Sequence, residues 1–437
     1  MTTHKILAHA GIALLLLLLS ACGSSGSSGT PSAVTSSSLS SVSFPSSSSV
    51  SSASSSSSSA AMFPDYNNQP LPADMTGMES TAAEIAGRIT IGLNIGNTLE
   101  AMGGKTETYW GNPVITEEFV TFAKASGFNA IRLPVSWDQY ANQDTAEIEQ
   151  PWLDRVKEVV QYCIDNDLYV LVNIHWDGGW LERNITPEKH DEVNARQKAY
   201  WEQIATLLRD FDERVMFASA NEPHVENAEQ MAVLLSYHQT FVDTVRATGG
   251  KNAYRVLVIQ GPKTDIQTTY ELMHSMPVDT VADKLMAEVH FYDPFNFTLM
   301  EQDESWGNRS YFWGEGFHSE SHPERNSTWG EEDHVDEKFD LMKTQFVDQG
   351  IPVILGEYGA TIRTHLTGDD LQLHLASRGY YFNYVTQRAI ANGMVPFLWD
   401  TGGLLDRRNY TVLDQLGLDG LMQGASVHPP YWQDSEE

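Results

Sequence analysis

The sequence predicts an α/β protein, a (β/α)8 barrel that follows a disordered serine-rich linker. Three observations support this fold class. Short β-rich runs alternate with longer amphipathic segments, the alternation continues without a second linker from about residue 75 to about residue 427, and the composition before residue 65 is quite different. Near-continuous apolar strands separated by helices are typical of a parallel sheet that is covered on both faces.

Residues 1–21 predict an export signal of the lipoprotein type. Lys5 supplies the positive start, and the apolar run 10–19 is too short to span a bilayer. Small residues directly before Cys22 resemble the bacterial lipobox, in which the signal is cleaved before the cysteine and its thiol carries a lipid. The alternative is an ordinary signal that is cleaved near Ala21. Because Gly23 follows, the resemblance implies the outer membrane or cell surface of a Gram-negative source, and otherwise a secreted protein.

Residues 22–64 predict a disordered linker. Serine dominates this stretch, and no charged residue lies between Lys5 and Asp65. Such a composition cannot bury enough apolar surface to offset the entropy that ordering would cost. A flexible chain of about 40 residues spans about 35 Å on average. We therefore expect a tether between a lipid on Cys22 and a folded domain at residues 65–437.

The charge balance excludes some classes of partner. Acidic residues number 58 and basic residues 27, so the formal net charge is −31. Nucleic acid would be repelled, and we expect membrane contact only through the lipid. With two cysteines in the chain, a disulfide framework or a cysteine-built metal site is not expected. We expect a monomer.

The barrel prediction depends on eight β-rich runs. Helical patterns lie between several of them, at 116–126, 152–166, 196–209 and 228–248. Eight such units in roughly 350 residues fit a closed TIM barrel better than an open doubly wound sheet. No glycine-rich nucleotide-binding motif follows any run, so we predict no cofactor. The runs are 89–95, 130–135, 169–174, 215–220, 255–259, 286–291, 353–355 and 395–398.

Polar and aromatic side chains follow seven of these runs. A barrel of this kind carries its chemistry at the carboxyl ends of its strands, so these side chains are expected to meet at one mouth. Only the fifth run, which ends in Gln260, offers little. The others end in Asn94 and Asn97, in Arg132, in His175 and Trp176, in Asn221 and Glu222, in His290 and Tyr292, in Glu357, and in Trp399.

Two of these residues, Glu222 and Glu357, suggest cleavage of a glycosidic bond. That reaction needs one carboxyl group that protonates the departing oxygen and another that attacks the anomeric carbon or activates water. The fourth and seventh strands place these glutamates roughly across the mouth from each other. The acid must hold a proton near neutral pH, while a nucleophile must stay ionised. Arg132 is the expected cation that keeps Glu357 ionised.

The remaining strand-end residues suit supporting roles. Asn221 can donate to a sugar 2-hydroxyl, and Tyr292 can donate to the nucleophile. His175 and His290 can orient carboxylates or sugar hydroxyls. Trp399 offers a flat apolar face for a pyranose ring. Trp176 and Asn97 also follow predicted strands, and they are therefore candidate substrate contacts as well. Each residue alone has an ordinary structural explanation, but seven strand ends that point such groups into one mouth favour a functional site.

The chain resembles glycoside hydrolase family 5, a family of retaining barrel enzymes that includes many bacterial cellulases. The resemblance runs from residues 91–100 to Trp399, and its most specific elements are Asn221-Glu222-Pro223 and residues 356–359. Residues 132–135, 173–176 and 290–292 fall in the family order around them. The resemblance implies that Glu222 is the acid/base catalyst and Glu357 the nucleophile, with carboxyl groups about 5–5.5 Å apart. It also implies that Arg132, His175, Asn221, His290, Tyr292 and Trp399 form the supporting set.

The motifs specify the substrate less closely than the mechanism. Residues 97–100 and 110–113 look most like the endoglucanase branch, so we expect a β-1,4-glucan polysaccharide or oligosaccharide. A xyloglucanase, a mixed-linkage glucanase or a mannanase remains an alternative, and a non-catalytic carbohydrate-binding barrel or a phosphate-handling barrel a remote one. We expect the long segment 297–336 to form one wall of the cleft. Its histidines and acids show no recognised metal-ligand spacing, so no metal is predicted.

Overall fold

The computed structural model describes residues 61–428. The predicted signal at 1–21, the lipidation site Cys22 and most of the linker therefore lie outside the described residues. Phe63, which the sequence analysis assigns to the linker, packs against the core, and the Arg196 guanidinium lies 5.6 Å from its ring centroid. The folded part thus begins slightly before the predicted boundary at residue 65. No helix among residues 61–428 has the length and apolar character that a membrane span needs.

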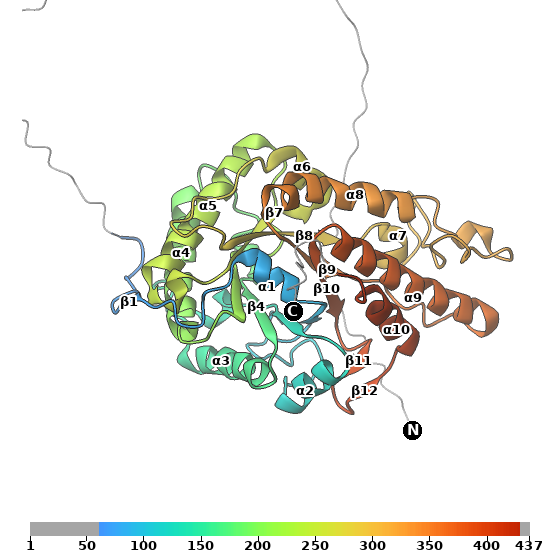
Figure 1. Ribbon diagram of the computed structural model, residues 1–437, viewed down its shortest axis with the longest axis horizontal. Helices are drawn as coiled ribbons and strands as arrows, with labels where there is room; N and C mark the ends of the chain where they lie inside the picture. The colour runs from blue at the N-terminus through green and yellow to red at the C-terminus, as the bar shows by residue number, and fades with distance from the viewer. Residues whose placement is uncertain (1–60, 429–437) are drawn as a thin grey trace, which may run out of the picture. The chain divides into compact units, whose positions relative to one another are not determined.

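Eight parallel strands close into a barrel, which confirms the predicted fold class (Figure 1). Their order around the barrel is β10-β2-β3-β4-β5-β7-β8-β9, so each strand pairs with its neighbour along the chain and the last closes onto the first. The strands are β2 (Gly92–Ile95), β3 (Ala130–Leu133), β4 (Tyr169–Asn173), β5 (Val215–Ala218), β7 (Leu257–Asp265), β8 (Leu285–Phe291), β9 (Val353–Tyr358) and β10 (Met394–Asp400).

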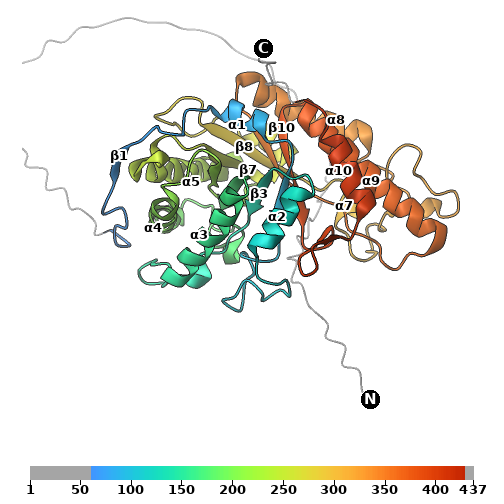
Figure 2. The same ribbon diagram turned by 60° about the horizontal axis from the view of Figure 1, so that its bottom comes forward.

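A helix follows every barrel strand and covers the outside of the barrel. In Figures 1 and 2, α9 and α10 lie side by side on the same flank, next to α8. Thr116 precedes α2 (Glu117–Ala125) and Asn227 precedes α5 (Ala228–Ala247). The side chain of each accepts a backbone N–H of the first turn of its helix. The covering helices are α2 (Glu117–Ala125), α3 (Gln150–Asp165), α4 (His190–Leu208), α5 (Ala228–Ala247), α6 (Ile266–Leu272), α8 (Glu332–Gln345), α9 (Gly368–Ala391) and α10 (Gln415–Gly424).

The element boundaries differ from the prediction in places. The run 89–95 contains the end of a helix as well as a strand, because α1 (Ala82–Arg88) ends at Ile89 and β2 begins only at Gly92. Thr81 and Glu84 form a capping box at the start of α1, a helix that lies directly before the predicted strand and was not predicted. The fifth strand, β7, continues beyond the predicted end at residue 259 as far as Asp265.

Two apolar cores hold the barrel. The larger core lies between the strands and the covering helices, and the smaller one fills the barrel interior below the polar mouth. Ile85 and Ala86 of α1 belong to the inner core, so this helix closes the end of the barrel opposite the mouth. The inner core is tight: a Cβ on Gly92 would come within 2.1 Å of the Phe397 ring, so that position requires glycine.

A strap at the N-terminal side ties the chain to the closed end of the barrel. Strand β1 (Leu71–Ala73) pairs in parallel with β6 (Gly249–Gly250), which lies between α5 and β7. Gly249 has φ +69°, and a Cβ there would meet the Leu71 carbonyl oxygen. The remaining short elements are η1 (Asp138–Tyr140), η2 (Asp177–Gly179), η3 (Lys251–Ala253), α7 (Phe295–Thr298), η4 (Pro323–Arg325), η5 (Val347–Gln349), β11 (Leu405–Asp406) and β12 (Thr411–Val412).

Candidate active site

Strand register brings the predicted site residues into rows at the mouth. Trp399 of β10 pairs with Asn94 of β2, and Asn94 pairs with Arg132 of β3. On the opposite side of the barrel, His290 of β8 pairs with Glu357 of β9. Residues that pair across parallel strands point to the same face of the sheet, and the hydrogen bonds among these side chains define one polar layer.

Arg132 is the centre of this layer and is fully buried. Its Nη1 donates to Glu357 Oε1 at 2.8 Å and to Asn94 Oδ1 at 2.9 Å. Its Nη2 donates to Asn221 Oδ1 at 2.9 Å and lies 3.0 Å from Glu288 Oε1. Burial works against the charge of Arg132, but Glu288 and Glu357 raise its pKa above the ordinary value. One guanidinium therefore orients residues on β2, β8 and β9 together with Asn221, which follows β5.

Glu357 is held on both carboxylate oxygens. Arg132 contacts Oε1, and the Tyr292 hydroxyl donates to Oε2 at 3.0 Å. The backbone just before Glu357 is fixed as well, because Asn94 Nδ2 donates to the Gly356 carbonyl at 2.8 Å. Burial raises the pKa of Tyr292 well above its ordinary value, and the charges of Glu357 and Glu222 add to this rise. Tyr292 consequently stays a hydrogen-bond donor at neutral pH.

Glu222 and Glu357 both lie near the same ring nitrogen of His290. His290 Nδ1 lies 2.9 Å from Glu222 Oε1 and 3.9 Å from Glu357 Oε2. A carboxylate oxygen of Glu222, a ring nitrogen of His290 and a carboxylate oxygen of Glu357 all lie within 4.8 Å of one another. The Glu222 side chain is 45% exposed, whereas that of Glu357 is 7% exposed. This trio has ligand-type atoms, but these atoms already bond to one another and to Arg132 and Tyr292, so it forms an acid–base cluster.

The titration of this cluster is coupled. Burial tends to lower the pKa of His290, but Glu357, Glu222 and Glu288 together raise it to about 9. Burial raises the pKa of Glu357, opposed by His290 and Arg132 and reinforced by the nearby Glu222. Arg132 and Tyr292 both donate to Glu357, which stabilises a negative charge on this carboxylate.

Trp399 and His175 line the same mouth. Their rings are parallel within 7°, with centroids 5.7 Å apart, and the indole of Trp399 packs over Gly96. Burial lowers the pKa of His175 well below its ordinary value, and the positive charges of Arg132 and His290 lower it further. His175 is therefore neutral at physiological pH, and its Nδ1 lies 3.3 Å from Asn173 Nδ2.

Two predicted substrate contacts, Trp176 and Asn97, lie in loops after their strands and contact other loop residues. Trp176 begins the turn after β4, and the Arg183 guanidinium covers its ring at 5.3 Å from the centroid. Asn97 follows β2 with φ +57°, and its carbonyl accepts from Asn112 Nδ2 at 3.1 Å. These contacts give Trp176 and Asn97 a role in holding their loops. Their contact with substrate stays a prediction.

Sequence reasoning missed two buried residues on β7 and β8. Glu288 is fully buried, and its Oε1 contacts both Arg132 and His290. Burial raises the pKa of Glu288, but Arg132 and then His290 more than reverse this, and the net pKa is lowered. Gln260 accepts from Ser219 Oγ at 2.7 Å and from the Ala220 N–H at 2.9 Å. Glu288 was detectable, since it stands two residues before His290 and so faces the same side of its strand.

A third missed residue, Glu182, lies behind Glu222. It follows β4 in a loop, is 6% exposed, and its Oε1 accepts the Glu222 backbone N–H at 2.6 Å. Its own carbonyl accepts the His224 N–H at 3.0 Å. Burial raises the pKa of Glu182 to about 8, and the charge of Glu222 contributes to the rise. No strand pattern points to this loop residue.

The long segment after α7 carries its polar residues in separate pairs. His318 Nε2 lies 2.7 Å from Glu331 Oε1, and His334 Nε2 lies 2.8 Å from Asp293 Oδ2. Trp306 of this segment is 63% exposed. Its part in forming a cleft wall stays a prediction.

The fold and this cluster define a barrel glycoside hydrolase, and comparison with known proteins gives the family. The model for cellulase (glycosyl hydrolase family 5) matches residues 94–403. The chain therefore belongs to glycosyl hydrolase family 5, which confirms the resemblance seen in its motifs.

Relatives and solved structures agree with this assignment. The chain is 36% identical over 380 residues to a xyloglucan-specific endo-beta-1,4-glucanase of Bacteroides ovatus, covering 83% of this chain and 74% of the relative. It is 33% identical over 394 residues to endoglucanase A of Paenibacillus barcinonensis, covering 83% and 94%. A Bacteroides ovatus GH5 xyloglucanase in complex with a XXXG heptasaccharide gives a TM-score of 0.76 at 33% identity, covering 84% and 81%. A GH5-4 broad specificity endoglucanase from Ruminococcus champanellensis with bound cellotriose gives 0.68 at 32% identity, covering 79% and 99%.

Proposed function

We propose that this protein is an exported, endo-acting β-1,4-glucanase that hydrolyses internal β-1,4-glucosidic bonds with retention of configuration. The observation that carries the proposal is the glutamate pair, because oxygens of Glu222 and Glu357 lie within 4.8 Å. Retaining enzymes hold their two carboxyl groups about 5–5.5 Å apart, whereas inverting enzymes leave about 6.5–9.5 Å for a water molecule. The endoglucanase relatives support a β-glucan as the substrate.

In the first step, Glu357 attacks the anomeric carbon and Glu222 donates its proton to the departing glycosidic oxygen. In the second step, Glu222 takes a proton from water, which attacks the same carbon and releases Glu357. Asn221 suits the 2-hydroxyl of the reacting sugar, because Arg132 engages its Oδ1 and leaves its Nδ2 as a donor. Trp399 supplies an apolar face for the ring, as its indole stands at the mouth opposite His175.

The charges of the buried layer balance, which supports an ionised Glu357 as the nucleophile. Arg132 and His290 carry two positive charges in a buried layer, and ionised Glu288 and Glu357 neutralise them. Glu182, which is neutral below its pKa of about 8, adds no charge to this layer. Because an uncompensated charge in a buried site is costly, this distribution is the favoured one before substrate binds.

The retaining assignment is tested by the stereochemistry of a nucleophile variant. We expect Glu357→Gly to lose activity by roughly a thousandfold or more, a loss of about 4 kcal/mol of transition-state stabilisation. Added azide should restore turnover of an activated cellobioside and give the α-glycosyl azide. Glu202→Gln is a matched control, since Glu202 is a buried glutamate on α4. Full activity of Glu357→Gly without azide would disprove the assignment.

Xyloglucan is a second candidate substrate. The observation that favours it is the similarity to the xyloglucan-specific relatives from Bacteroides ovatus. Relative rates on barley β-glucan, carboxymethylcellulose, xyloglucan and glucomannan decide between an endoglucanase, a xyloglucanase, a mixed-linkage glucanase and a mannanase. Glu357→Gln should still bind its glucan, which separates loss of catalysis from loss of binding.

We also propose that the protein is held at the cell surface by a lipid on Cys22 and acts there as a monomer. The support is the composition of residues 1–64, with an apolar run, small residues before Cys22 and a serine-rich linker. Cys22→Ser should move the protein from the membrane fraction to the soluble fraction of the cell envelope or the medium. Unchanged fractionation would contradict lipid anchoring, and sedimentation of the released protein tests the monomer.

A further inference from the structure

A buried pair of side chains, Gln260 and Glu288, lies behind the acid–base cluster and takes no part in the two proposed chemical steps. The two residues pair in register across β7 and β8, and both are fully buried. Gln260 Nε2 donates to Glu288 Oε2 at 2.5 Å. A buried carboxylate is costly at a strand position where an apolar side chain would pack without that cost. The presence of Glu288 therefore points to a role in the site.

Hydrogen bonds fix the direction of the Gln260 amide. Its Oε1 accepts the Ala220 N–H at 2.9 Å and the Ser219 hydroxyl at 2.7 Å. Because a backbone N–H can only donate, the amide oxygen must face Ala220, and the amide NH2 group must then face Glu288. Glu288 Oε2 is consequently an acceptor, and the carboxylate cannot turn without breaking this bond. Its other oxygen, Oε1, is thereby directed toward His290.

The neighbouring strand leaves room for this carboxylate. Glu288 Oε1 lies 3.0 Å from Arg132 Nη2 and 3.3 Å from His290 Nε2. A Cβ on Gly356 of β9 would come within 2.0 Å of the same oxygen, although Gly356 does not have a positive φ. Glycine is thus required at position 356 by the space that Glu288 occupies and not by the backbone. The surrounding strands therefore hold one oxygen of Glu288 against His290.

Both ring nitrogens of His290 face carboxylate oxygens. Nδ1 lies 2.9 Å from Glu222 Oε1, and Nε2 lies 3.3 Å from Glu288 Oε1. Arg132 Nη2 lies 3.5 Å from Nε2, but its two hydrogens are directed to Asn221 Oδ1 and Glu288 Oε1. Nε2 therefore has no donor to accept from, and a proton on each nitrogen satisfies both carboxylates. A ring in this state has no lone pair with which to accept a further proton.

We infer that Glu288, held in place by Gln260, is a positioning residue for the acid/base catalyst Glu222. It keeps both nitrogens of His290 protonated, so Glu222 Oε1 accepts a hydrogen bond from His290 and Glu222 Oε2 carries the proton that passes to the departing oxygen. The inference rests on the proposed retaining mechanism and deepens it. A neutral ring would instead offer Nδ1 as an acceptor and would bind the proton that the reaction needs. Among residues 61–428, Glu222 Oε2 has no hydrogen-bond partner, and the side chain is 45% exposed, which leaves this oxygen for the substrate.

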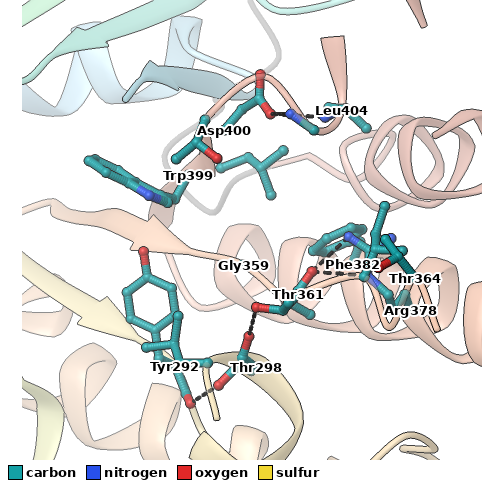
Figure 3. A pocket seen from close by; sticks show the side chains of 16 residues that line it. Tyr292, Thr298, Gly359, Thr361, Thr364, Arg378, Phe382, Trp399, Asp400 and Leu404 are labelled. Atoms are coloured by element: carbon teal, nitrogen blue, oxygen red, sulfur yellow. Dashed lines mark hydrogen bonds between the residues drawn. The ribbon is translucent and has the colours of Figure 1, made fainter. Parts of the chain in front are cut away.

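Substitutions at Gln260 and Glu288 leave the substrate surface of the mouth unchanged. A cavity of about 410 Å³ opens there, and Figure 3 shows Tyr292 and Trp399 at its edge. Gln260 and Glu288 are not among the residues that line it. The bond from Tyr292 to Glu357 does not involve Glu288 either. A loss of activity in these variants then reports on the acid/base catalyst rather than on sugar binding.

The protonation of His290 is measured by nitrogen NMR of enzyme with isotope-labelled histidine, with His290→Asn to assign the signals. We expect both ring nitrogens to be protonated at neutral pH, and we expect Glu288→Gln to move the loss of the ring proton to lower pH by about one unit or more. An unprotonated ring nitrogen in the unaltered enzyme would overturn the inference, and so would an unchanged titration in the variant. Because no turnover is needed, this measurement decides the inference even if the proposed hydrolysis is disproved. The other titratable groups around His290 are unaltered in this variant: Glu222, Glu357, Arg132, Glu182 and His175, with Asp265, Asp293, Tyr292 and Lys338 around a small cavity beside the ring.

Aryl cellobiosides measure the consequence for catalysis. A departing phenolate needs a proton from Glu222, whereas a dinitrophenolate does not. We expect kcat/KM of Glu288→Gln to fall about tenfold or more on the phenyl substrate and to stay within about threefold on the dinitrophenyl substrate. Asp279→Asn is the matched control, because Asp279 precedes β8 and its buried carboxylate lies 2.6 Å from Arg246 Nη2, outside the site. This control should keep both rates, and an equal loss on both substrates in folded Glu288→Gln would overturn the inference.

Exchanging the two side chains separates their bonding from their packing. In Glu288→Gln alone, the new amide turns an NH2 group either to the NH2 group of Gln260 or to Arg132 and His290. In the double variant Gln260→Glu/Glu288→Gln, the amide at position 288 can donate to the carboxylate at position 260 and still present its oxygen to His290. We expect this exchange to recover most of the activity lost on the phenyl substrate, and no recovery in a folded exchange variant would overturn the inference.

A milder variant decides the matter if Glu288→Gln does not fold. Gln260→Met keeps every charge of the cluster and removes only the amide that holds Glu288. We expect a loss of about threefold or more on the phenyl substrate and none on the dinitrophenyl substrate, because the acid is then held less firmly. Unchanged rates on both substrates would show that Gln260 does not act through Glu288 and would overturn the inference.

Discussion

Replacing Glu182 by alanine should damage acid catalysis without touching the reacting atoms. In the structure its carboxylate accepts the backbone N–H of Glu222 at 2.6 Å, in a buried position. Alanine removes this acceptor but keeps the second link, from the His224 N–H to the main-chain carbonyl of residue 182. The loop after β4 should therefore remain in place, while Glu222 loses the contact that fixes its backbone.

The size of the effect follows from the hydrogen bond. A buried N–H that is left without an acceptor costs about 1–3 kcal/mol. If Glu222 moves to avoid this cost, its proton no longer points at the glycosidic oxygen, and each 1.4 kcal/mol of lost stabilisation lowers the rate about tenfold. We thus expect kcat/KM for a substrate that needs acid assistance to fall by about ten- to a hundredfold. General acid catalysis as a whole contributes about 10²–10⁴, so a misplaced acid accounts for a loss of this size.

Aryl cellobiosides separate this effect from a general loss of structure. A dinitrophenolate leaves without a proton, whereas an unsubstituted phenolate needs Glu222. Because kcat/KM reports the first chemical step, Glu182→Ala should lose activity on the phenyl substrate and keep it on the dinitrophenyl substrate. Glu202→Ala is the matched control: Glu202 is also buried and also accepts a backbone N–H, from Tyr66 at 2.9 Å. An equal loss on both leaving groups would refute the reasoning, and so would no loss at all.

Two further predictions concern the cations of the layer. Arg132→Met should lower the free energy of unfolding by about 3–5 kcal/mol and abolish activity, because it leaves Glu288 and Glu357 buried without their partner; a denaturant titration that showed no change would contradict this. The charged form of His290 stabilises the fold, since its pKa of about 9 exceeds the ordinary 6.5. This stabilisation is complete below about pH 6.5 and is lost as the pH rises through about 9, so the stability gap between the unaltered protein and His290→Asn should narrow over that range. A gap that widened with rising pH would rule out the assigned charge.

Most of the fold was predictable because the hydrophobic pattern of a parallel barrel is local. Runs of apolar residues become strands wherever both faces are covered, and that rule places all eight strands. The boundaries were less predictable, because tertiary contacts set them. Ile89 looks like the start of a strand, yet the capping box at Thr81 and Glu84 makes the residues before it helical, and the core inside the barrel holds them there.

The site was predictable to the extent that strands position it. Glu222, His290 and Glu357 follow or end strands, so the barrel brings them together once its order is known. Gln260 also follows a predicted strand, but its role is visible only through its partners Ser219, just after β5, and Glu288 on β8. Glu182 could not have been found, because a loop of irregular backbone carries it to Glu222 and no periodic pattern encodes that path.

The pairing of β1 with β6 has a practical consequence for handling the enzyme. This pairing lies between the end of α5 and the start of β7, at the end of the barrel that α1 closes. Glu222 and Glu357 lie at the opposite end, where the mouth of the barrel is open. Coupling the chain to a bead, a sensor surface or a fusion partner through the strap just before β1 would thus direct the cleft away from the support. Coupling through the loops after β9 or β10 would instead place the support at the entrance that a polymer must reach.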